Sequence, residues 1–153
     1  MEIVDYRPEH ARAFHDLNLA WISKLFEVEA KDLEVIEDPE GKIIAKGGKI
    51  FMAVDGGRAV GCVAMIAMAD GGYEVAKMTV DESLRGAGLG RLLMQRCIDE
   101  ADALGAPRLY LETNSSLGPA LGLYRAMGFR ELVGDERPAS PYARCDVWME
   151  RRA

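Results

Sequence analysis

The stretch VDESLRGAGLGRLLMQ, residues 80–95, carries three glycines within five positions, at Gly86, Gly88 and Gly90. The segment before it alternates between apolar and polar residues, which predicts a strand. The segment after it has an apolar stripe, which predicts a helix. The first N–H groups of a helix have no partner inside the helix, and the helix dipole favours an anion there. Glycines give a bulky phosphate room to approach and permit unusual backbone angles. The stretch therefore predicts a pyrophosphate site at the start of this helix.

Arg85 and Arg91 stand on either side of the glycines and add positive charge suited to phosphate. Two better-known phosphate loops do not fit. A Walker loop ends in Gly-Lys followed by Ser or Thr, whereas Gly90 is followed by Arg91 and Leu92. A dinucleotide fingerprint needs a third glycine where Arg91 stands, and it opens a βαβ unit rather than following a run of hairpins. The remaining alternative is a glycine-rich turn that only joins a strand to a helix.

The composition is that of an ordinary globular protein with an excess of acidic side chains. The chain has 153 residues, 49% hydrophobic and 29% charged, and this length suits one domain over residues 1–153. The formal net charge of -6 argues against nucleic acid and against an anionic membrane surface as partners. The three cysteines form no C-x-x-C pair, and His10 and His15 do not share a helix face, so no metal site is expected. With no signal peptide or membrane span apparent, we expect a cytoplasmic protein.

The order of elements predicts an α/β fold. Asp-Gly-Gly occurs twice between apolar runs, at residues 55–57 and 70–72, and predicts tight turns that join three antiparallel strands. The expected strands are 1–6, 49–54, 58–69, 73–80, 108–114, 129–134 and 144–152, and the expected helices are 8–26, 29–37, 90–105 and 118–128, with a loop over 38–48. This order indicates one central mixed, mostly antiparallel sheet flanked by helices.

A second motif, ALGLYRAMGFRE at residues 120–131, follows the glycine stretch. Residues 85–90 also fit the pattern Gln/Arg-x-x-Gly-x-Gly/Ala. Together the two motifs resemble the acetyl-CoA-binding segment and the tyrosine-bearing helix of the GNAT superfamily of N-acetyltransferases. The order of elements resembles that fold along nearly the whole chain. The resemblance, which is to small bacterial members, implies a single GNAT-like domain whose strands splay apart at the cofactor cleft.

The resemblance also implies acetyl-CoA as co-substrate and a set of residues that contact it. In the family, the pantetheine arm pairs with the main chain of the strand before the glycine turn, here residues 77–80, and helix N–H groups hold the pyrophosphate. The implied contacts are Met78, Thr79, Val80, Arg85, Gly86, Ala87, Gly88, Leu89, Gly90, Arg91, Asn114 and Tyr124. The family often has Asn seven residues before the helix tyrosine, where this chain has Leu117. Asn114, three residues earlier, is the alternative polar contact.

Two residues are candidates for proton transfer. Tyr124 matches the family's general acid, and an unperturbed tyrosine stays protonated at neutral pH. Glu74 is the candidate general base, because strict alternation along residues 73–80 puts it on the same face as Met78, whose main chain would contact the thioester. An aromatic packing role for Tyr124 and a solvated strand-edge role for Glu74 are the alternatives.

The resemblance implies an acetyl-CoA-dependent N-acetyltransferase that acts on a primary amine of a small molecule, amino acid or peptide by direct attack on the thioester. A non-catalytic acyl-CoA-binding or regulatory module is the alternative. A nucleotide-binding oxidoreductase is disfavoured, because Arg91 stands where the dinucleotide fingerprint needs its third glycine. We expect the acceptor site from the N-terminal helices and two loops. Its candidate residues are Glu34, Glu37, Asp38 and Arg144. A monomer or a homodimer is expected, and the closing hairpin could pair across a dimer.

Overall fold

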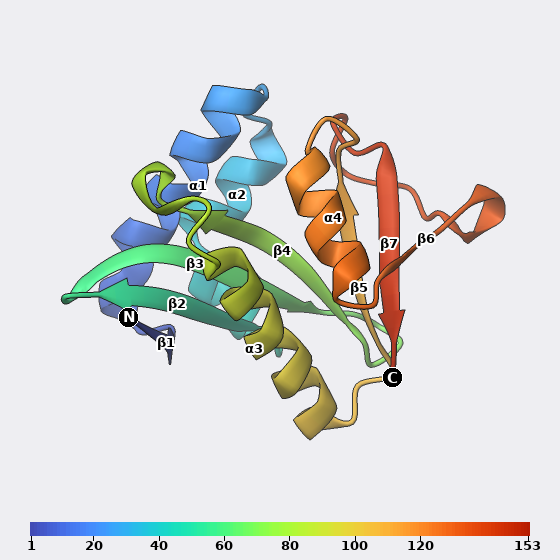
Figure 1. Cartoon of the computed structure of the whole chain (residues 1–153), viewed down its shortest axis with the longest axis horizontal. Coiled ribbons are helices and arrows are strands. Elements are labelled where there is room, and N and C mark those ends of the chain that lie inside the picture. The colour runs from blue at the N-terminus through green and yellow to red at the C-terminus, as the bar shows by residue number, and fades with distance from the viewer.

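Seven strands form one sheet in the order β1-β2-β3-β4-β5-β7-β6 in a computed structural model that describes residues 1–153 (Figure 1). The strands are β1 Glu2–Asp5, β2 Lys49–Asp55, β3 Arg58–Ala67, β4 Tyr73–Val80, β5 Arg108–Thr113, β6 Arg130–Glu131 and β7 Val147–Arg152. All neighbouring strands are antiparallel except β4 and β5, which are parallel. The expected mixed, mostly antiparallel sheet is confirmed.

The tight turns fall where the Asp-Gly-Gly sequences predict them. Gly56 and Gly57 link β2 to β3 with φ angles of 57° and 82°. Two successive positive φ angles match the right-handed twist of the strands, and glycine adopts them without a steric penalty. Gly71, with a φ of 88°, serves the same purpose between β3 and β4. Local turn chemistry therefore fixes the order of β2, β3 and β4.

Helices cover both faces of the sheet (Figure 1). The helices are α1 Ala11–Leu25, α2 Ala30–Glu37, α3 Leu89–Leu104 and α4 Gly118–Ala126. Buried residues of α3 and α4 join one hydrophobic cluster, and those of α1 and α2 join a second on the opposite face. In α3 the buried positions Leu89, Leu93, Cys97 and Ala101 recur every fourth residue, which is the expected apolar stripe. The helix ends at Gly105, whose φ of 67° makes it a left-handed cap.

Most elements match the expected ranges to within a few residues, and three segments need comment. Residues 38–48 are not all loop, because a turn of π-helix covers Glu40–Ile44. Its Ile43 is only 1% exposed, so burial stabilises a turn that the neighbouring Pro and Gly residues obscure in the sequence. The strand expected over 129–134 is limited to Arg130–Glu131, since the 3-10 turn Gly134–Glu136 follows it closely. β7 begins at Val147 rather than at residue 144.

None of the helices has both the length and the apolar character that crossing a membrane requires.

Candidate active site

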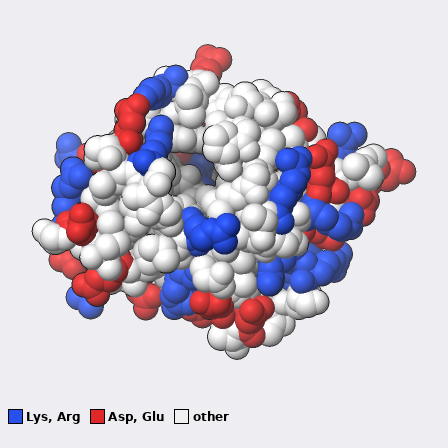
Figure 2. Space-filling model, in the orientation of Figure 1, with Lys and Arg blue, Asp and Glu red and all other residues white.

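The sheet parts between its two parallel strands. β4 and β5 are in register only at Tyr73–Leu109 and Glu74–Tyr110, whereas β5 pairs with β7 along its whole length. Beyond Glu74 the two strands diverge (Figure 1). A cavity of about 380 Å³ lies in this gap, and Figure 2 shows a hollow in the middle of the surface, bordered largely by uncharged atoms. The splayed strands expected at the cofactor cleft are confirmed.

Side chains from both faces of the sheet line this cavity. From the side of α3 and α4 come Val75, Met78, Leu111, Leu117, Pro119, Ala120 and Tyr124. From the side of α1 and α2 come Asn18, Trp21, Ile22, Leu25, Phe26, Glu74, Ala76, Lys77, Glu112, Tyr142 and Arg144. The cavity therefore passes through the sheet, and two reactants can approach each other from opposite faces.

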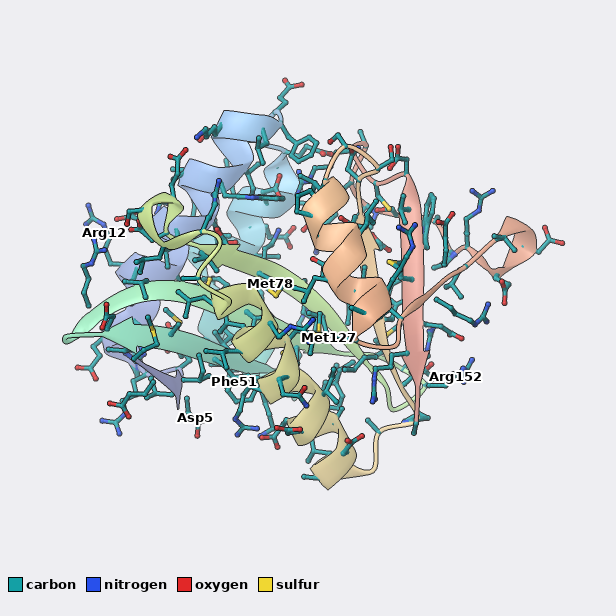
Figure 3. All side chains as sticks on the ribbon, in the orientation of Figure 1. Asp5, Arg12, Phe51, Met78, Met127 and Arg152 are labelled. Carbon is teal, nitrogen blue, oxygen red and sulfur yellow. The ribbon has the colours of Figure 1, made fainter.

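A β-bulge in β4 divides the site residues between the two faces. Lys77 has a φ of 55°, and the register on β3 shifts so that Lys77 and Met78 lack a partner there. The extra residue reverses the alternation. Met78 packs with the α3 cluster and lies between α3 and α4 in Figure 3, whereas Glu74 pairs with Ile66, which packs with the α1 and α2 cluster. The expectation that Glu74 and Met78 share a face is wrong, because it assumed an unbroken period of two.

The glycine stretch ends with free N–H groups at the start of α3. Gly86 and Gly88 have φ angles of 85° and 83°, which residues with a Cβ rarely adopt. A Cβ at either position would meet no atom within 4 Å, so the space above the turn is open. The N–H groups of Gly86 and of residues 88–91 donate to no main-chain acceptor. The arrangement suits an anion, since the N–H groups and the helix dipole both favour negative charge.

Tyr124 lies on α4 and lines the cavity on the α3 and α4 side. Its ring packs against Phe129 with 6.1 Å between the ring centroids. Burial raises the pKa of the Tyr124 hydroxyl to about 12, and no hydrogen bond contributes. The hydroxyl is therefore protonated at neutral pH and free to donate a proton into the cavity.

Glu74 lies on the α1 and α2 side of the cavity, where few groups stabilise its negative charge. Burial, followed by the charge of Glu112, raises the pKa of Glu74 to about 7, although the nearby Lys77 ammonium opposes the rise. Glu112 was not expected at the site. Its two oxygens accept hydrogen bonds of 2.6 Å from the hydroxyls of Tyr110 and Ser140. The alternation of residues 108–113, which puts Tyr110 and Glu112 on the face of Glu74, was the available signal.

A buried ionic network lies beside Glu74 and links three distant segments. Asp32 of α2 is 0% exposed. It accepts hydrogen bonds from Lys77 Nζ at 3.0 Å and from two guanidinium nitrogens of Arg144 at 2.8 and 2.5 Å. Burial alone would raise the pKa of Asp32, but the hydrogen bonds from Arg144 and the charge of Lys77 outweigh it and lower the pKa to about 2. No sequence motif predicts this network.

The other expected residues divide between the cavity and the surface. Met78, Arg85, Asn114 and Tyr124 line the cavity, whereas Thr79, Val80 and Arg85 line a second hollow beside α1. Asn114 also donates to the carbonyl of Arg144 at 2.7 Å, so its amide braces the loop before β7. Of the expected acceptor residues, Arg144 lines the cavity. Glu34 instead pairs with Lys31 and Lys42, and Glu37 and Asp38 line neither cavity.

A mixed sheet parted between parallel strands, next to a glycine-rich helix start, is the arrangement that the resemblance to N-acetyltransferases implies. The model of the acetyltransferase (GNAT) family matches residues 11–129. The chain is 36% identical over 112 residues to an "IAA acetyltransferase" of Azospirillum brasilense, an overlap of 72% of this chain and 66% of the relative. An acetyltransferase of the GNAT family from Staphylococcus aureus superposes with a TM-score of 0.87 at 20% identity, with 99% of this chain and 98% of that chain covered.

An aminoglycoside 6'-N-acetyltransferase in complex with coenzyme A superposes with a TM-score of 0.73 at 18% identity, covering 99% of this chain and 97% of that one. The chain spans 66%, 21% and 36% of the lengths of the first three curated relatives that it matches. Since the family model covers most of the sequence, this chain belongs to the acetyltransferase (GNAT) family.

Proposed function

We propose that this chain is an acetyl-CoA-dependent N-acetyltransferase that acts on a primary amine, and that residues 1–153 form one such domain. The observation that carries the proposal is the cavity between β4 and β5, which Tyr124 lines from one face of the sheet and Glu74 from the other. Attack of an amine on a thioester needs a proton acceptor on the amine side and a proton donor on the thiol side. Glu74 and Tyr124 supply this pair, and membership of the GNAT family supports the same reaction.

Acetyl-CoA has two groups of main-chain partners in the proposal. The unpaired N–H groups at Gly86 and residues 88–91 would hold the pyrophosphate, with Arg85 and Arg91 close to it in the sequence. Beyond Glu74, the edge of β4 that faces β5 has no strand partner. Its main-chain groups at Met78 and Val80 are therefore available to the amides of the pantetheine arm, which would add to the edge like a short strand. The coenzyme A complex of a protein of similar fold supports this choice of co-substrate.

The proposed reaction proceeds by direct attack. Glu74, whose pKa is about 7, accepts a proton from the ammonium group of the acceptor, directly or through water. The neutral amine then attacks the thioester carbonyl carbon, and a main-chain N–H near Met78 stabilises the developing oxyanion. As the C–S bond breaks, the Tyr124 hydroxyl, whose pKa is about 12, donates its proton to the departing thiolate. The nitrogen of the new amide loses its second proton, which returns the Tyr124 phenolate to the hydroxyl form through water, and Glu74 releases its own proton to solvent.

Release of free coenzyme A from acetyl-CoA with a panel of primary amines tests the proposal. We expect release that depends on the amine, and an amine product heavier by one acetyl group. If acetyl-CoA raises the melting temperature but no amine produces release, the chain is a non-catalytic acyl-CoA-binding module. If NAD raises the melting temperature and acetyl-CoA does not, a nucleotide-binding oxidoreductase replaces the proposal.

A further inference from the structure

Two of the three cations that line the cavity are already paired. Lys77 and Arg144 both contact the buried Asp32 at 3.0 Å or less. The third, Arg85, comes directly before the glycine turn and belongs with the proposed pyrophosphate site. Arg144 also contacts Glu29 at 3.3 Å. An arginine held by two carboxylates has few donors left for a third, so neither Lys77 nor Arg144 is free to receive an incoming carboxylate.

An aromatic ring also covers these two cations. Lys77 Nζ lies 4.7 Å from the centroid of the Tyr142 ring, and Arg144 Cζ lies 4.5 Å from the same centroid. The Tyr142 hydroxyl accepts a hydrogen bond from Lys77 Nζ at 3.1 Å. Cation–π contacts of this kind further satisfy the positive charges and restrict the approach of an anion to them.

The carboxylates on the α1 and α2 side, Glu74 and Glu112, form no ion pair, although the charges of Lys77 and Lys31 act on Glu74 from a distance. Glu112 accepts hydrogen bonds only from the uncharged hydroxyls of Tyr110 and Ser140. Glu74 has no hydrogen-bond partner that lowers its pKa, and it lies close enough to Glu112 for the two charges to repel. The acceptor side of the cavity therefore carries an excess of negative charge. Such a surface attracts an ammonium group and disfavours a carboxylate attached next to it.

Another part of the same lining is apolar and aromatic. The last turns of α1 contribute Trp21, Ile22, Leu25 and the following Phe26 to the lining. The ring centroids of Trp21 and Phe26 lie 5.8 Å apart, with an angle of 55° between the ring planes. Arg144 Cζ lies 5.8 Å from the centroid of the Phe26 ring. A planar apolar group can stack in such a setting, and burial of its surface stabilises the complex.

We infer that the acceptor is a primary amine carried on an uncharged aromatic body, with no carboxylate beside the amine. This inference rests on the proposed function of the same site, and it narrows that function by substrate chemistry. Asp32 determines the specificity indirectly, because it occupies the two cations that would otherwise receive a carboxylate. Trp21 and Phe26 determine it directly, because they contact the body of the acceptor.

Four amines test the charge argument and the aromatic argument separately: 2-phenylethylamine, phenylalaninamide, phenylalanine and ethylamine. The middle two share a ring and an α-amine and differ in one carboxylate charge. The carboxylate also makes the amine of phenylalanine more basic, so kcat/KM, measured by free coenzyme A release, is compared per neutral amine. We expect it to be at least about tenfold higher for phenylalaninamide than for phenylalanine. We expect a similar ratio, about tenfold or more, for 2-phenylethylamine over ethylamine. Equal rates within the first pair overturn the charge argument, and equal rates within the second overturn the aromatic argument.

Calorimetric binding of the same four compounds keeps the inference separate from the proposed function. If no amine is acetylated but 2-phenylethylamine binds and phenylalanine does not, the enzyme proposal fails and the inference stands. If acetylation occurs and phenylalanine is the best of the four acceptors, the inference fails and the enzyme proposal stands. If none of the four binds or reacts while another amine is acetylated, the inference is again overturned.

Trp21→Ala tests the aromatic wall by mutation. We expect kcat/KM for 2-phenylethylamine to fall at least about tenfold, and kcat/KM for ethylamine to change little. Trp21→Leu repeats the test if the alanine variant melts too low. Leu104→Ala is the control, because Leu104 is 47% exposed at the far end of α3 and does not line the cavity. A loss shared equally by both amines would mean that Trp21 only supports the fold.

Discussion

At the residue scale, Glu74 has a carboxyl group whose pKa of about 7, raised by burial and by Glu112, allows it to change charge near neutrality. In the proposed role it must be ionised to accept a proton, so kcat/KM should rise with pH through about 7. Glu74→Gln should remove this limb and lower kcat/KM by about 100-fold, a typical general-base contribution. The pH–rate profiles of both proteins, measured with one amine, check the prediction.

The control for Glu74→Gln is Glu34→Gln, since Glu34 lies on the surface and pairs with Lys31 and Lys42. Its profile should match that of the unmodified protein. If the acidic limb of Glu74→Gln stays at the same pH, the proton acceptor is another group or water.

Tyr124 has the complementary property of a hydroxyl that remains protonated, because burial raises its pKa to about 12. Tyr124→Phe keeps the ring that packs on Phe129 and removes only the proton donor. We expect kcat to fall by about 100-fold with little change in the KM for acetyl-CoA, because the hydroxyl acts mainly in the transition state. Steady-state kinetics at several pH values measure this split. Tyr6→Phe is the matched control, because Tyr6 lines neither cavity. An unchanged kcat for Tyr124→Phe would exclude the role.

At the element scale, the two ends of α3 offer a matched pair of glycines. Gly88 begins the helix with a φ of 83°, and Gly105 ends it with a φ of 67°. A Cβ at either position would meet no atom within 4 Å. Alanine at each should therefore lower stability by a similar amount, about 1 kcal/mol from the left-handed backbone alone.

Only the N-terminal substitution should affect the co-substrate. We expect Gly88→Ala to weaken acetyl-CoA binding by at least about tenfold, because its methyl group enters the space beside the unpaired N–H groups. Gly105→Ala should bind acetyl-CoA normally. Calorimetric titration of both variants measures the difference. Equal affinities would indicate that the glycine stretch is only a turn.

The bulge in β4 couples the shape of the strand to the charge of the site. Lys77 adopts a φ of 55°, and its ammonium reaches Asp32 on α2 at 3.0 Å. The same ammonium lowers the pKa of Glu74 against the stronger effect of burial. Lys77→Met should therefore move the acidic limb of the pH–rate profile to higher pH, and should destabilise the fold by about 3 kcal/mol because it breaks a buried ion pair.

For Lys77→Met the informative measurement is the pH at which the acidic limb lies, since a purely structural role would lower activity at every pH alike. Lys46→Met, an exposed lysine outside both cavities, is the control. A limb that stays in place while stability falls would separate Lys77 from the titration of Glu74.

At the scale of the whole molecule, features encoded by neighbouring residues were predictable from the sequence. Gly56 and Gly57 specify their hairpin through local backbone angles, and the apolar stripe of α3 repeats within a few turns. The glycine stretch and the helix of Tyr124 together indicated the family.

Features that depend on distant residues were not predictable. Asp32 and Arg144 are 112 positions apart in the sequence, so no local pattern connects them. The bulge at Lys77 follows from pairing with β3, and strict alternation along β4 alone gave the wrong face for Glu74. The depth of the cavity, which gives Glu74 its raised pKa, likewise arises only when α1, β4, β5, α4 and the loop before β7 assemble.

The charge of Glu74 should also be visible in the stability of the whole molecule. Its folded-state pKa of about 7 lies above the ordinary glutamate value of 4.5, so the folded protein binds this proton more tightly than the unfolded chain does. Stability from this group is therefore fully present below pH 4.5 and is lost as pH rises through about 7. The glutamine of Glu74→Gln cannot ionise, so the variant does not lose stability in this pH range. We expect the variant to be more stable than the unmodified protein at pH 8, by on the order of 2 kcal/mol, with little difference at pH 4. Urea denaturation at the two pH values measures this, and Glu34→Gln should behave in the opposite sense, because Lys42 and Lys31 lower the pKa of Glu34. A stability difference for Glu74→Gln that does not depend on pH would mean that the carboxyl group titrates normally, and would remove the physical basis for its role as a base.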